Sequence, residues 1–314
     1  MRIIVTGGAG FIGSNLVDQL LALDHEVLVL DNLSTGKSKF LESAFKSKKF
    51  IFENLDLLDS NKLNSVMKNI DAVVHLAANA DVRFGWEHPY KDFEQNVQCT
   101  QNVLESMRIN GVKKIIFSST GSVYGESATI PTPEDAPFPL QTSLYGASKL
   151  SAEGLIQAYA EAGFINATIF RFVSILGPRY THGHIFDFFK QLRADPDILR
   201  ILGDGSQRKS YLHVSDCVSA ILTRLSSQSS IEIFNLGLND YVDVSTSAKR
   251  ICSAMNLEPI FEFSGGNKGW IGDNPFILLD TKKICSTGWT PSTPLLEAID
   301  STVEWLDENQ WVFE

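Results

Sequence analysis

The first half of the chain alternates short apolar, β-branched runs with longer stretches of helical periodicity. The runs predict strands, which occupy residues 2–6, 27–30, 50–52, 72–76, 114–118 and 167–172. Helices are predicted between them, notably over residues 89–109 and 144–163. Strands that alternate with helices form a parallel sheet, and such sheets bind ligands at the carboxyl ends of their strands.

After about residue 173 the pattern changes, because "GPR" (177–179) and a segment rich in His and Phe (182–189) interrupt the alternation. Shorter units separated by turns follow. We therefore predict an α/β fold with two parts. Residues 1–173 form a Rossmann-type domain with a doubly wound parallel sheet, and residues 174–314 form a smaller α/β lobe. Strands or helices near 212–240 are expected to return to the first domain.

Composition narrows the class of protein. The 314 residues are 44% hydrophobic and carry a net charge of -10, which argues against nucleic acid as the main partner. The four cysteines are far apart and indicate reduced thiols in a cytoplasmic protein. No apolar run approaches the ~20 residues that span a bilayer. The chain begins at once with a strand, so we expect no signal peptide and a soluble, cytoplasmic protein.

The stretch "TGGAGFIG" places Gly7, Gly10 and Gly13 between the first strand and the first helix. These glycines allow a tight turn, a close approach to a pyrophosphate and close packing of helix on sheet. The helix N-terminus then offers amides to the phosphates. Asp31, at the end of the second strand, is positioned to bind an adenosine ribose. Because a carboxylate repels a 2′-phosphate, the sequence predicts NAD rather than NADP.

Other strand-end residues have two interpretations each. Asp56 could meet the adenine edge or serve as a turn or cap residue. The small residues of "HLAANADV" (75–82) would let the cofactor pass close, whereas His75 itself is expected to pack at the strand end. Asn96 is a candidate cofactor contact, although an ordinary polar surface residue is the default.

Within "SLYGASK", Tyr145 and Lys149 lie one helical turn apart on the same face. A lysine ammonium and a nicotinamide cation nearby would both lower the pKa of the tyrosine from its usual value near ~10. Tyr145 thus becomes a candidate acid–base group for proton transfer coupled to hydride transfer.

The motifs "TGGAGFIG", "DNLSTG", "HLAA", "SSTGSVYG" and "YGASK" together resemble the extended short-chain dehydrogenase/reductase family. They are most similar to its UDP-glucose (UDP-galactose) 4-epimerases and related nucleotide-sugar enzymes. The resemblance covers the whole chain, because "GDGSQRKSYLHVSD" (203–216) and "GWIGD" (269–273) resemble the motifs of the substrate lobe. It implies that residues 174–314 bind a nucleotide sugar.

The resemblance implies roles by position. The catalytic residues would be Thr120, Tyr145 and Lys149. The cofactor would be held by Gly7, Gly10, Phe11, Ile12, Gly13, Asp31, Asn32, Ser34, Thr35, Gly36, Asp56, Leu57, Leu76, Ala77, Ala78, Asn96, Ser118, Tyr145, Lys149 and Phe172. The substrate would be bound by Thr120, Tyr145, Ser174, Arg208, Lys209 and Asp273. Tyr124 is expected to shape the loop at the strand end and the substrate pocket.

The residues after Thr120 distinguish between reactions. Relatives that dehydrate or decarboxylate nucleotide sugars carry acids there, whereas this chain has Gly121 and Ser122. The resemblance therefore implies oxidation and re-reduction at C4 with NAD kept bound, most simply between UDP-glucose and UDP-galactose. The alternatives are another epimerase acting on an N-acetylhexosamine or uronate, a keto-sugar reductase, or a non-catalytic relative that senses dinucleotides or binds RNA.

The substrate lobe departs from the family pattern. Ser174 replaces a usual asparagine, Lys209 replaces an arginine, and Trp270 stands where another arginine is expected. Phosphate contacts could pass to basic neighbours, which are Arg179, Arg208, Lys209 and Lys268. Ile277 occupies a position that limits N-acetyl groups in some epimerases. It is smaller than tyrosine, so N-acetylhexosamine substrates stay open. The sequence leaves the nucleotide base and the sugar open as well.

Two further expectations concern metals and partners. His182 and His184 have an HxH spacing without an evident third ligand, so no metal is expected. The resemblance implies a homodimer in which the helices near 89–109 and 144–163 pair as a four-helix bundle.

Overall fold

The computed structural model describes residues 1–79, 84–138, 140–270 and 273–313. Contacts within the chain divide it into two compact units. Unit 1 comprises Met1–Val123, Leu144–Arg171 and Val218–Phe234, and unit 2 comprises Tyr124–Ser143, Phe172–Cys217 and Asn235–Glu314. The simpler division at residue 173 stays a prediction. No helix in the described part of the chain is long and apolar enough to span a membrane.

A seven-stranded sheet in the order β11-β6-β5-β4-β1-β2-β3 forms the frame around which unit 1 is built. Its strands are β1 (Arg2–Thr6), β2 (Glu26–Asp31), β3 (Phe50–Asn54), β4 (Ala72–His75), β5 (Lys114–Thr120), β6 (Asn166–Phe172) and β11 (Ile231–Leu236). The pairs β1–β2, β2–β3, β1–β4 and β4–β5 are parallel. The chain reverses its direction of sheet growth between β1 and β4, which is where doubly wound sheets bind ligands. The predicted Rossmann-type fold class is confirmed.

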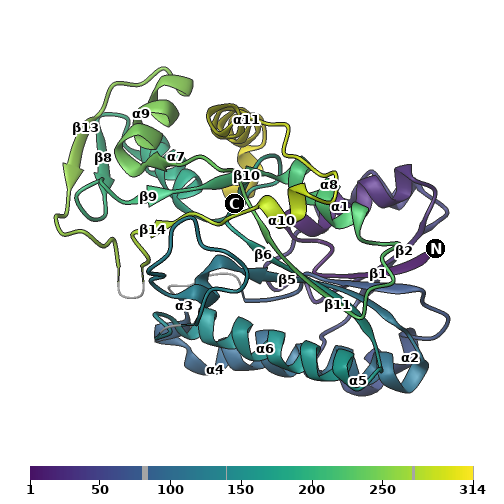
Figure 1. The fold of residues 1–314 in the computed structure, drawn as a ribbon. Helices are drawn as coiled ribbons and strands as arrows, with labels where there is room; N and C mark the ends of the chain where they lie inside the picture. The colour runs from purple at the N-terminus through teal and green to yellow at the C-terminus, as the bar shows by residue number, and fades with distance from the viewer. Residues whose placement is uncertain (80–83, 139, 271–272, 314) are drawn as a thin grey trace. The chain divides into compact units, whose positions relative to one another are not determined.

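Helices cover both faces of this sheet, with α5 and α6 on one face and α1 on the other (Figure 1). The helices of unit 1 are α1 (Phe11–Ala22), α2 (Ser60–Val66), α3 (Phe84–Glu87), α4 (Pro89–Asp92), α5 (Cys99–Asn110) and α6 (Leu144–Glu161), and α8 (Val214–Thr223) crosses the boundary between the units. Short 3₁₀ turns lie at η1 (Ser38–Leu41), η2 (Ala44–Lys46) and η4 (Gly121–Tyr124).

The predicted helix over 89–109 is not uniform, because Phe93–Gln98 (η3) is a π-helix between α4 and α5. Such π-helical turns shift the side chains of a helix relative to its axis and are frequent at functional sites.

The core of unit 1 explains why these elements form. Apolar residues of the sheet and of α2, α5 and α6 share one buried cluster, which includes Ile4, Val73, Ile115, Val103 and Ile156. Burying each such side chain contributes roughly 1.5–3 kcal/mol. The β-branched strands and the periodic apolar positions of the helices therefore specify the same packing.

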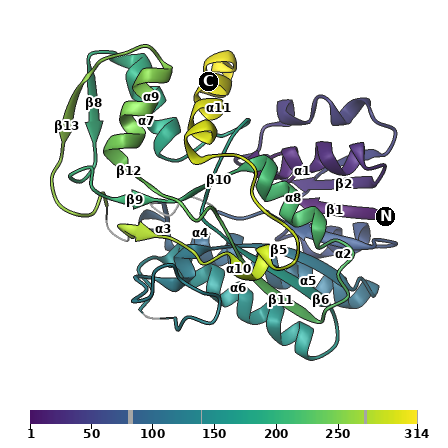
Figure 2. The ribbon, with the colours of Figure 1, turned by 45° about the horizontal axis from the view of Figure 1, so that its top comes forward.

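Unit 2 consists of small sheets and helices (Figure 2). β7 (Ser174–Leu176) pairs with β10 (Tyr211–His213), β8 (Ile198–Ile201) pairs with β13 (Ile260–Phe263), and β9 (Arg208–Lys209) lies between β12 (Val242–Asp243) and β14 (Phe276–Ile277). Its helices are α7 (His184–Ala194), α9 (Val244–Ala254), α10 (Lys282–Cys285) and α11 (Leu295–Glu308), followed by a 3₁₀ turn, η5 (Gln310–Phe313).

Candidate active site and cofactor cradle

The turn after β1 is a glycine cradle. Gly7 has a φ of +68°, and a Cβ there would lie 2.7 Å from the amide nitrogen of Ala77. A Cβ on Gly13 would lie 2.2 Å from the carbonyl oxygen of Gly7. α1 begins after Gly10 without a side-chain cap. The cradle therefore presents bare backbone and a helix N-terminus, a combination that fits a pyrophosphate.

Asp31 closes the cradle at the end of β2. Its carboxylate is buried and accepts hydrogen bonds from the amides of Ala9 (2.9 Å) and Leu33 (2.8 Å). Burial raises the pKa of Asp31, while the two amides oppose that shift. Each carboxylate oxygen retains a second lone pair, so the group can still accept from ribose hydroxyls. A Cβ on Gly36 would meet this carboxylate at 2.9 Å, which explains the glycine in "STG".

Neighbouring cofactor candidates lie on the same edge of the sheet. Asp56 accepts from the amide of Leu58 (2.9 Å) as a turn residue and from the side chain of Asn32 (3.0 Å). The side chain of Asn32 in turn accepts from the amide of Ser34. Leu57 is buried, whereas Ser34 and Thr35 are exposed. Asp56 is therefore a turn residue in the structure, and its contact with adenine stays a prediction.

The loop after β4 is fixed from two sides. The amides of Leu76 and Ala77 both donate to the hydroxyl of Thr6 at 3.2 Å. Asn96 accepts from the amide of Asn79 (2.9 Å) and donates to the hydroxyl of Ser148 on α6 (2.9 Å). The partly buried Ala78 lies between these two anchors, and residues 80–82 of "HLAANADV" fall outside the described residues.

The default interpretation of Asn96 as a surface residue is wrong, because its side chain is 1% exposed. The π-helical turn over Phe93–Gln98 directs it inward, between the loop after β4 and α6.

His75 is a structural residue, as predicted. It is fully buried between the hydroxyls of Thr6 (2.7 Å from Nδ1) and Thr100 (3.0 Å from Nε2). Burial, assisted by the charge of Lys149, lowers its pKa to about 3. It is therefore a neutral hydrogen-bonding residue near neutral pH.

Tyr145 and Thr120 meet at the carboxyl edge of the sheet. Tyr145 lies in the first turn of α6, Thr120 is the last residue of β5, and their hydroxyls share a hydrogen bond. The amide of Ser122 donates to the Thr120 oxygen (3.1 Å), and the two side-chain oxygens lie 3.2 Å apart. The turn after β5 thus orients the threonine hydroxyl toward the tyrosine.

Lys149 lies one turn further along α6. Its Nζ donates to the carbonyl oxygen of Ser118 (2.9 Å) and lies 4.8 Å from the ring centre of Phe117. Burial lowers its pKa to about 7, against the attraction of Glu153 and Asp92. The sequence motif had not singled out these two carboxylates, although Glu153 follows Lys149 at the same four-residue spacing.

The pKa of Tyr145 differs from the prediction. Although the side chain keeps some exposed surface, burial raises its pKa to about 12, and the hydrogen bond with Thr120 only partly offsets this. Lys149 does not reverse the shift in the protein itself, because its ammonium is directed to the carbonyl of Ser118. The predicted lowering therefore has to come from positive charge brought by a ligand.

The predicted substrate residues of unit 2 form their own polar cluster. Lys209 donates to Asp273 (2.8 Å) and to the carbonyl of Asn274 (2.9 Å), and its Nζ lies 5.6 Å from the centre of the Trp270 ring. Arg208 is exposed and its guanidinium lies over the rings of Tyr241 and Phe276. Lys209 and Asp273 neutralise each other. Of the two cations Arg208 and Lys209, Arg208 is therefore the more available to a ligand.

Other residues of this unit are placed as follows. Ser174 is exposed and pairs with Tyr211 in the sheet, while Phe172 is buried. Ile277 pairs with Lys209. Residues 271–272 of "GWIGD" fall outside the described residues.

Tyr124 is buried and donates to Asn235 (2.8 Å), so it packs within unit 2. Lys268 pairs with Glu126. The His184 ring lies between the hydroxyls of Ser247 (2.8 Å) and Tyr211 (3.0 Å). Among the described residues, no group of three or more His, Cys, Asp or Glu side chains could hold a metal ion.

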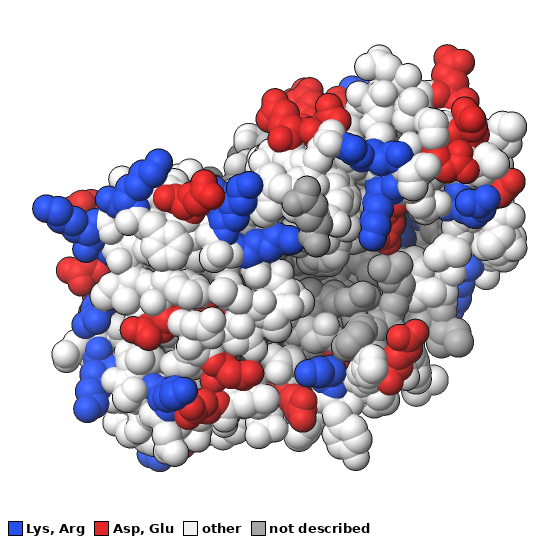
Figure 3. Space-filling model, turned by 180° about the vertical axis from the view of Figure 1, so that it is seen from behind, with Lys and Arg blue, Asp and Glu red and all other residues white. Residues whose placement is uncertain are grey.

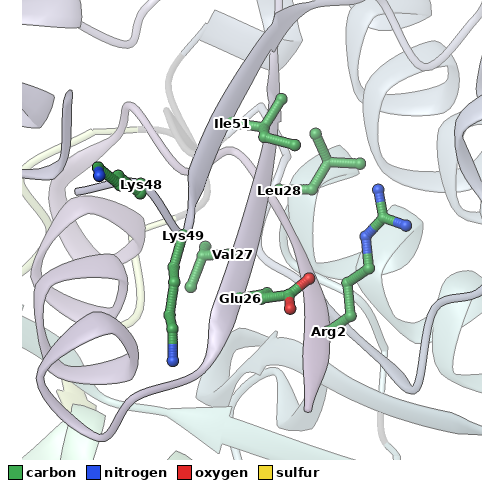
Figure 4. A pocket seen from close by; sticks show the side chains of 7 residues that line it. All are labelled: Arg2, Glu26, Val27, Leu28, Lys48, Lys49 and Ile51. Carbon is green, nitrogen blue, oxygen red and sulfur yellow. The ribbon is translucent and has the colours of Figure 1, made fainter.

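A pocket lies at the opposite edge of the sheet from the cradle (Figure 4). Its lining residues come from the first halves of β1, β2 and β3 and from the approach to β3, and they are Arg2, Glu26, Val27, Leu28, Lys48, Lys49 and Ile51. Because parallel sheets bind ligands at their carboxyl ends, this pocket is not the site. On the face seen in Figure 3, basic and acidic side chains of the described residues are interspersed.

The comparisons with known proteins agree with this geometry. The model of the NAD-dependent epimerase/dehydratase family matches residues 3–237. The chain belongs to this family. The UDP-glucose 4-epimerase of Mycolicibacterium smegmatis is 33% identical, over 97% of this chain and 98% of that protein. The predicted membership of the extended short-chain dehydrogenase/reductases is thereby confirmed.

Solved structures of family members match the whole fold. UDP-glucose 4-epimerase of Thermus thermophilus in complex with NAD is 31% identical, with a TM-score of 0.87 over 98% of this chain and 99% of that chain. UDP-glucuronic acid 4-epimerase of Bacillus cereus in complex with UDP-glucuronic acid and NAD is 27% identical, with a TM-score of 0.90 over 98% and 99%. The protein is an epimerase-type enzyme of nucleotide sugars, and NAD is its cofactor.

Proposed function

We propose that the protein is a nucleotide-sugar 4-epimerase that interconverts UDP-glucose and UDP-galactose through a 4-keto intermediate. The observation that carries this proposal is the Thr120–Tyr145 hydrogen bond one turn from Lys149, followed by a turn in which residues 121 and 122 carry no acid. Dehydration within this family needs an acid and a base beside the reacting sugar. Gly121 and Ser122 supply neither, so simple oxidation and re-reduction is favoured.

In this mechanism the chain moves one proton. Tyr145 accepts the proton of the sugar 4-hydroxyl and later returns it to the 4-keto oxygen, while Thr120 hydrogen-bonds the same oxygen and orients it. Lys149, in its protonated form, supplies positive charge one helical turn from the tyrosine and favours its phenolate once the cofactor is bound. NAD, when bound, supplies the acceptor and then the donor of the hydride at C4. The 4-keto sugar turns over between the two transfers, so the configuration at C4 inverts without net redox change.

The residues that would hold the cofactor follow from the cradle. Gly7, Gly10 and Gly13 would face the pyrophosphate, and Asp31 the adenosine ribose. Lys149 would hold the nicotinamide ribose. The remaining cofactor and substrate contacts that the resemblance implies are proposed with them, as are the substrate lobe over residues 174–314 and a cytoplasmic location.

The test uses purified protein without added NAD. It is incubated in turn with UDP-glucose, UDP-galactose and their N-acetyl and uronate counterparts, and products are separated by chromatography. We expect interconversion of UDP-glucose and UDP-galactose. Interconversion of the uronates or N-acetylhexosamines alone would replace the substrate assignment, and failure of every 4-epimer pair would overturn the proposal. A net keto-sugar reductase would instead consume NADH, which absorbance reports directly.

We also propose that the protein is a homodimer formed through the outer face of α5 and α6. Exposed apolar side chains on or near these helices support this, namely Tyr90, Phe93, Ile109 and Phe164. Analytical ultracentrifugation is expected to find a dimer. Ile109→Lys, which puts a charge on an exposed apolar position in the last turn of α5, should shift it toward monomer, and a monomeric wild type would contradict the proposal.

A further inference from the structure

We propose that Glu153 and Arg171 are positioning residues, which tie the helix of Tyr145 and Lys149 to the strand that ends at Thr120. The inference rests on the proposed catalytic role of those three residues. Glu153 lies four residues beyond "YGASK" and Arg171 is the first residue of "RFVSILGP", but the sequence assigned a role to neither side chain.

The pair is fully enclosed in unit 1. The side chain of Glu153 is 0% exposed and that of Arg171 is 2% exposed. Arg171 Nη2 donates to Oε2 of Glu153 at 2.7 Å, and its Nε donates to Oε1 at 3.1 Å. The resulting two-pronged geometry is the strong form of an arginine–carboxylate contact. Glu153 on α6 is thereby fixed to Arg171 on β6.

A second strand joins the same carboxylate. The hydroxyl of Ser119 on β5 donates to Oε1 of Glu153. Ser119 stands between Ser118, whose carbonyl accepts from Lys149, and Thr120, whose hydroxyl bonds Tyr145. Three consecutive residues of β5 therefore each contact α6.

The partners of those three residues follow one another along α6. Tyr145, Lys149 and Glu153 are spaced four residues apart and occupy one face of the helix. Thr120 meets Tyr145, Ser118 meets Lys149, and Ser119 meets Glu153. The Glu153 contact thus fixes the helix against sliding or rotating on the strand, the motions that would separate the tyrosine and threonine hydroxyls.

An ion pair is a costly way to join two elements, because apolar residues of similar volume are often as stable in such a place. The charge of Glu153, however, acts on Lys149. Glu153 is the leading attraction that opposes the desolvation of this lysine, ahead of Asp92 on α4. On its own helix Lys149 lies one turn from Tyr145, and from another element it is faced by His75 on β4, which is neutral near pH 7. Arg171 on β6 offsets part of the charge of Glu153.

The experiment compares Glu153→Gln and Arg171→Met with a matched control. Glu232→Gln changes a partly exposed glutamate on β11, where it pairs with Arg224. For each variant the kcat, the KM for UDP-glucose, the pH profile of kcat, bound NAD and the thermal midpoint are measured. The pKa of Lys149 is followed by NMR on lysine-labelled protein, with Lys149→Met to assign the signal.

For Glu153→Gln we expect kcat to fall by about 10- to 100-fold while KM changes little, because misplacement of reacting groups affects turnover. We expect the pKa of Lys149 to fall by about one unit, because an attractive charge is lost and that of Arg171 remains. The alkaline limb of the kcat profile should move with it. Glu232→Gln should leave kcat and the pH profile unchanged.

The double variant Glu153→Gln/Arg171→Met separates positioning from stability. It removes both buried charges, so it is expected to recover much of the thermal midpoint lost by Glu153→Gln alone without recovering kcat. Unchanged kcat and an unchanged Lys149 pKa in Glu153→Gln, with only a lower thermal midpoint, would overturn the proposal. Should the wild type epimerise none of the sugars, the shift of the Lys149 signal tests the pair independently of the proposed reaction.

Discussion

The two edges of the main sheet each bury a lysine, and the two lysines are alike in most respects. Lys149 at the carboxyl edge is 2% exposed and Lys114 at the amino edge is 6% exposed. Each amine donates to one neutral oxygen, that of the Ser118 carbonyl or that of the Thr168 hydroxyl. Burial lowers the pKa of Lys149 to about 7 and that of Lys114 to about 8.

The two lysines differ in the residues that surround them. Lys149 lies one turn from Tyr145, whose hydroxyl bonds Thr120, at the edge where the glycine cradle opens. Lys114 meets Thr168, with Glu232 near it. A buried amine with a low pKa is therefore weak evidence of a site. Hydroxyls that converge at the carboxyl ends of parallel strands are the stronger sign.

The largest expected effect of a substitution is at Tyr145. Tyr145→Phe removes the proposed proton acceptor and should lower kcat by roughly 10²- to 10⁴-fold, while NAD stays bound. Tyr159→Phe is the matched control on the same helix, where the hydroxyl contacts Gln101 and Glu105 instead. It should turn over normally. Retained activity in Tyr145→Phe would mean that the reaction does not take place at the carboxyl edge. Loss of folding would mean that Tyr145 has a structural role.

The next largest expected effect is the difference in kcat between variants of the two lysines. Lys149→Met should reduce kcat strongly and weaken NAD retention, because the charge beneath the tyrosine is lost. Lys114→Met should leave kcat unchanged and the free energy of unfolding unchanged or higher by about 1 kcal/mol, because a desolvated amine is replaced by an apolar chain. Turnover assays and urea titrations of both variants make the measurement. Equal losses of kcat would mean that the two edges are not functionally distinct.

The sequence predicted the arrangement of residues at the carboxyl edge well where that arrangement depends on local spacing. Gly7, Gly13 and Asp31 lie in one strand–turn–helix–strand unit, and Tyr145 and Lys149 lie on one helical turn. The βαβ order alone then places Thr120 on the same edge. These features could be predicted because they need no knowledge of which distant side chains touch.

The failures all depend on contacts between distant segments. Asn96 was a candidate cofactor contact whose default interpretation was a surface residue, because a π-helical turn and a partner 52 residues away, Ser148, leave no mark in the sequence. The link between Glu153 and Arg171 joins α6 to β6, so the pattern of either element alone does not reveal it. The pKa of Tyr145 was predicted to fall beside Lys149 and a nicotinamide cation, yet in the protein alone burial, which spacing does not report, raises it.

The last expected effect is on stability at alkaline pH, and it compares the two edges in one experiment. The folded-state pKa of Lys114 lies near 8 and its ordinary value is 10.5, so the unfolded chain binds more protons between these pH values. Stability attributable to this group therefore rises from pH 8 to 10, by up to about 3 kcal/mol. Lys149 acts in the same direction from about pH 7.

Urea midpoints from pH 7 to 9 test this, and the range stops short of pH ~10, at which tyrosines ionise in the unfolded chain. Lys114→Met should remove the part of the rise that begins at pH 8, and Lys149→Met the part that begins at pH 7. When NAD is bound, the Lys149 contribution should change and the Lys114 contribution should not, because only the carboxyl edge would meet the ligand. A ligand effect on the Lys114 contribution of equal size would contradict the separation of the two edges.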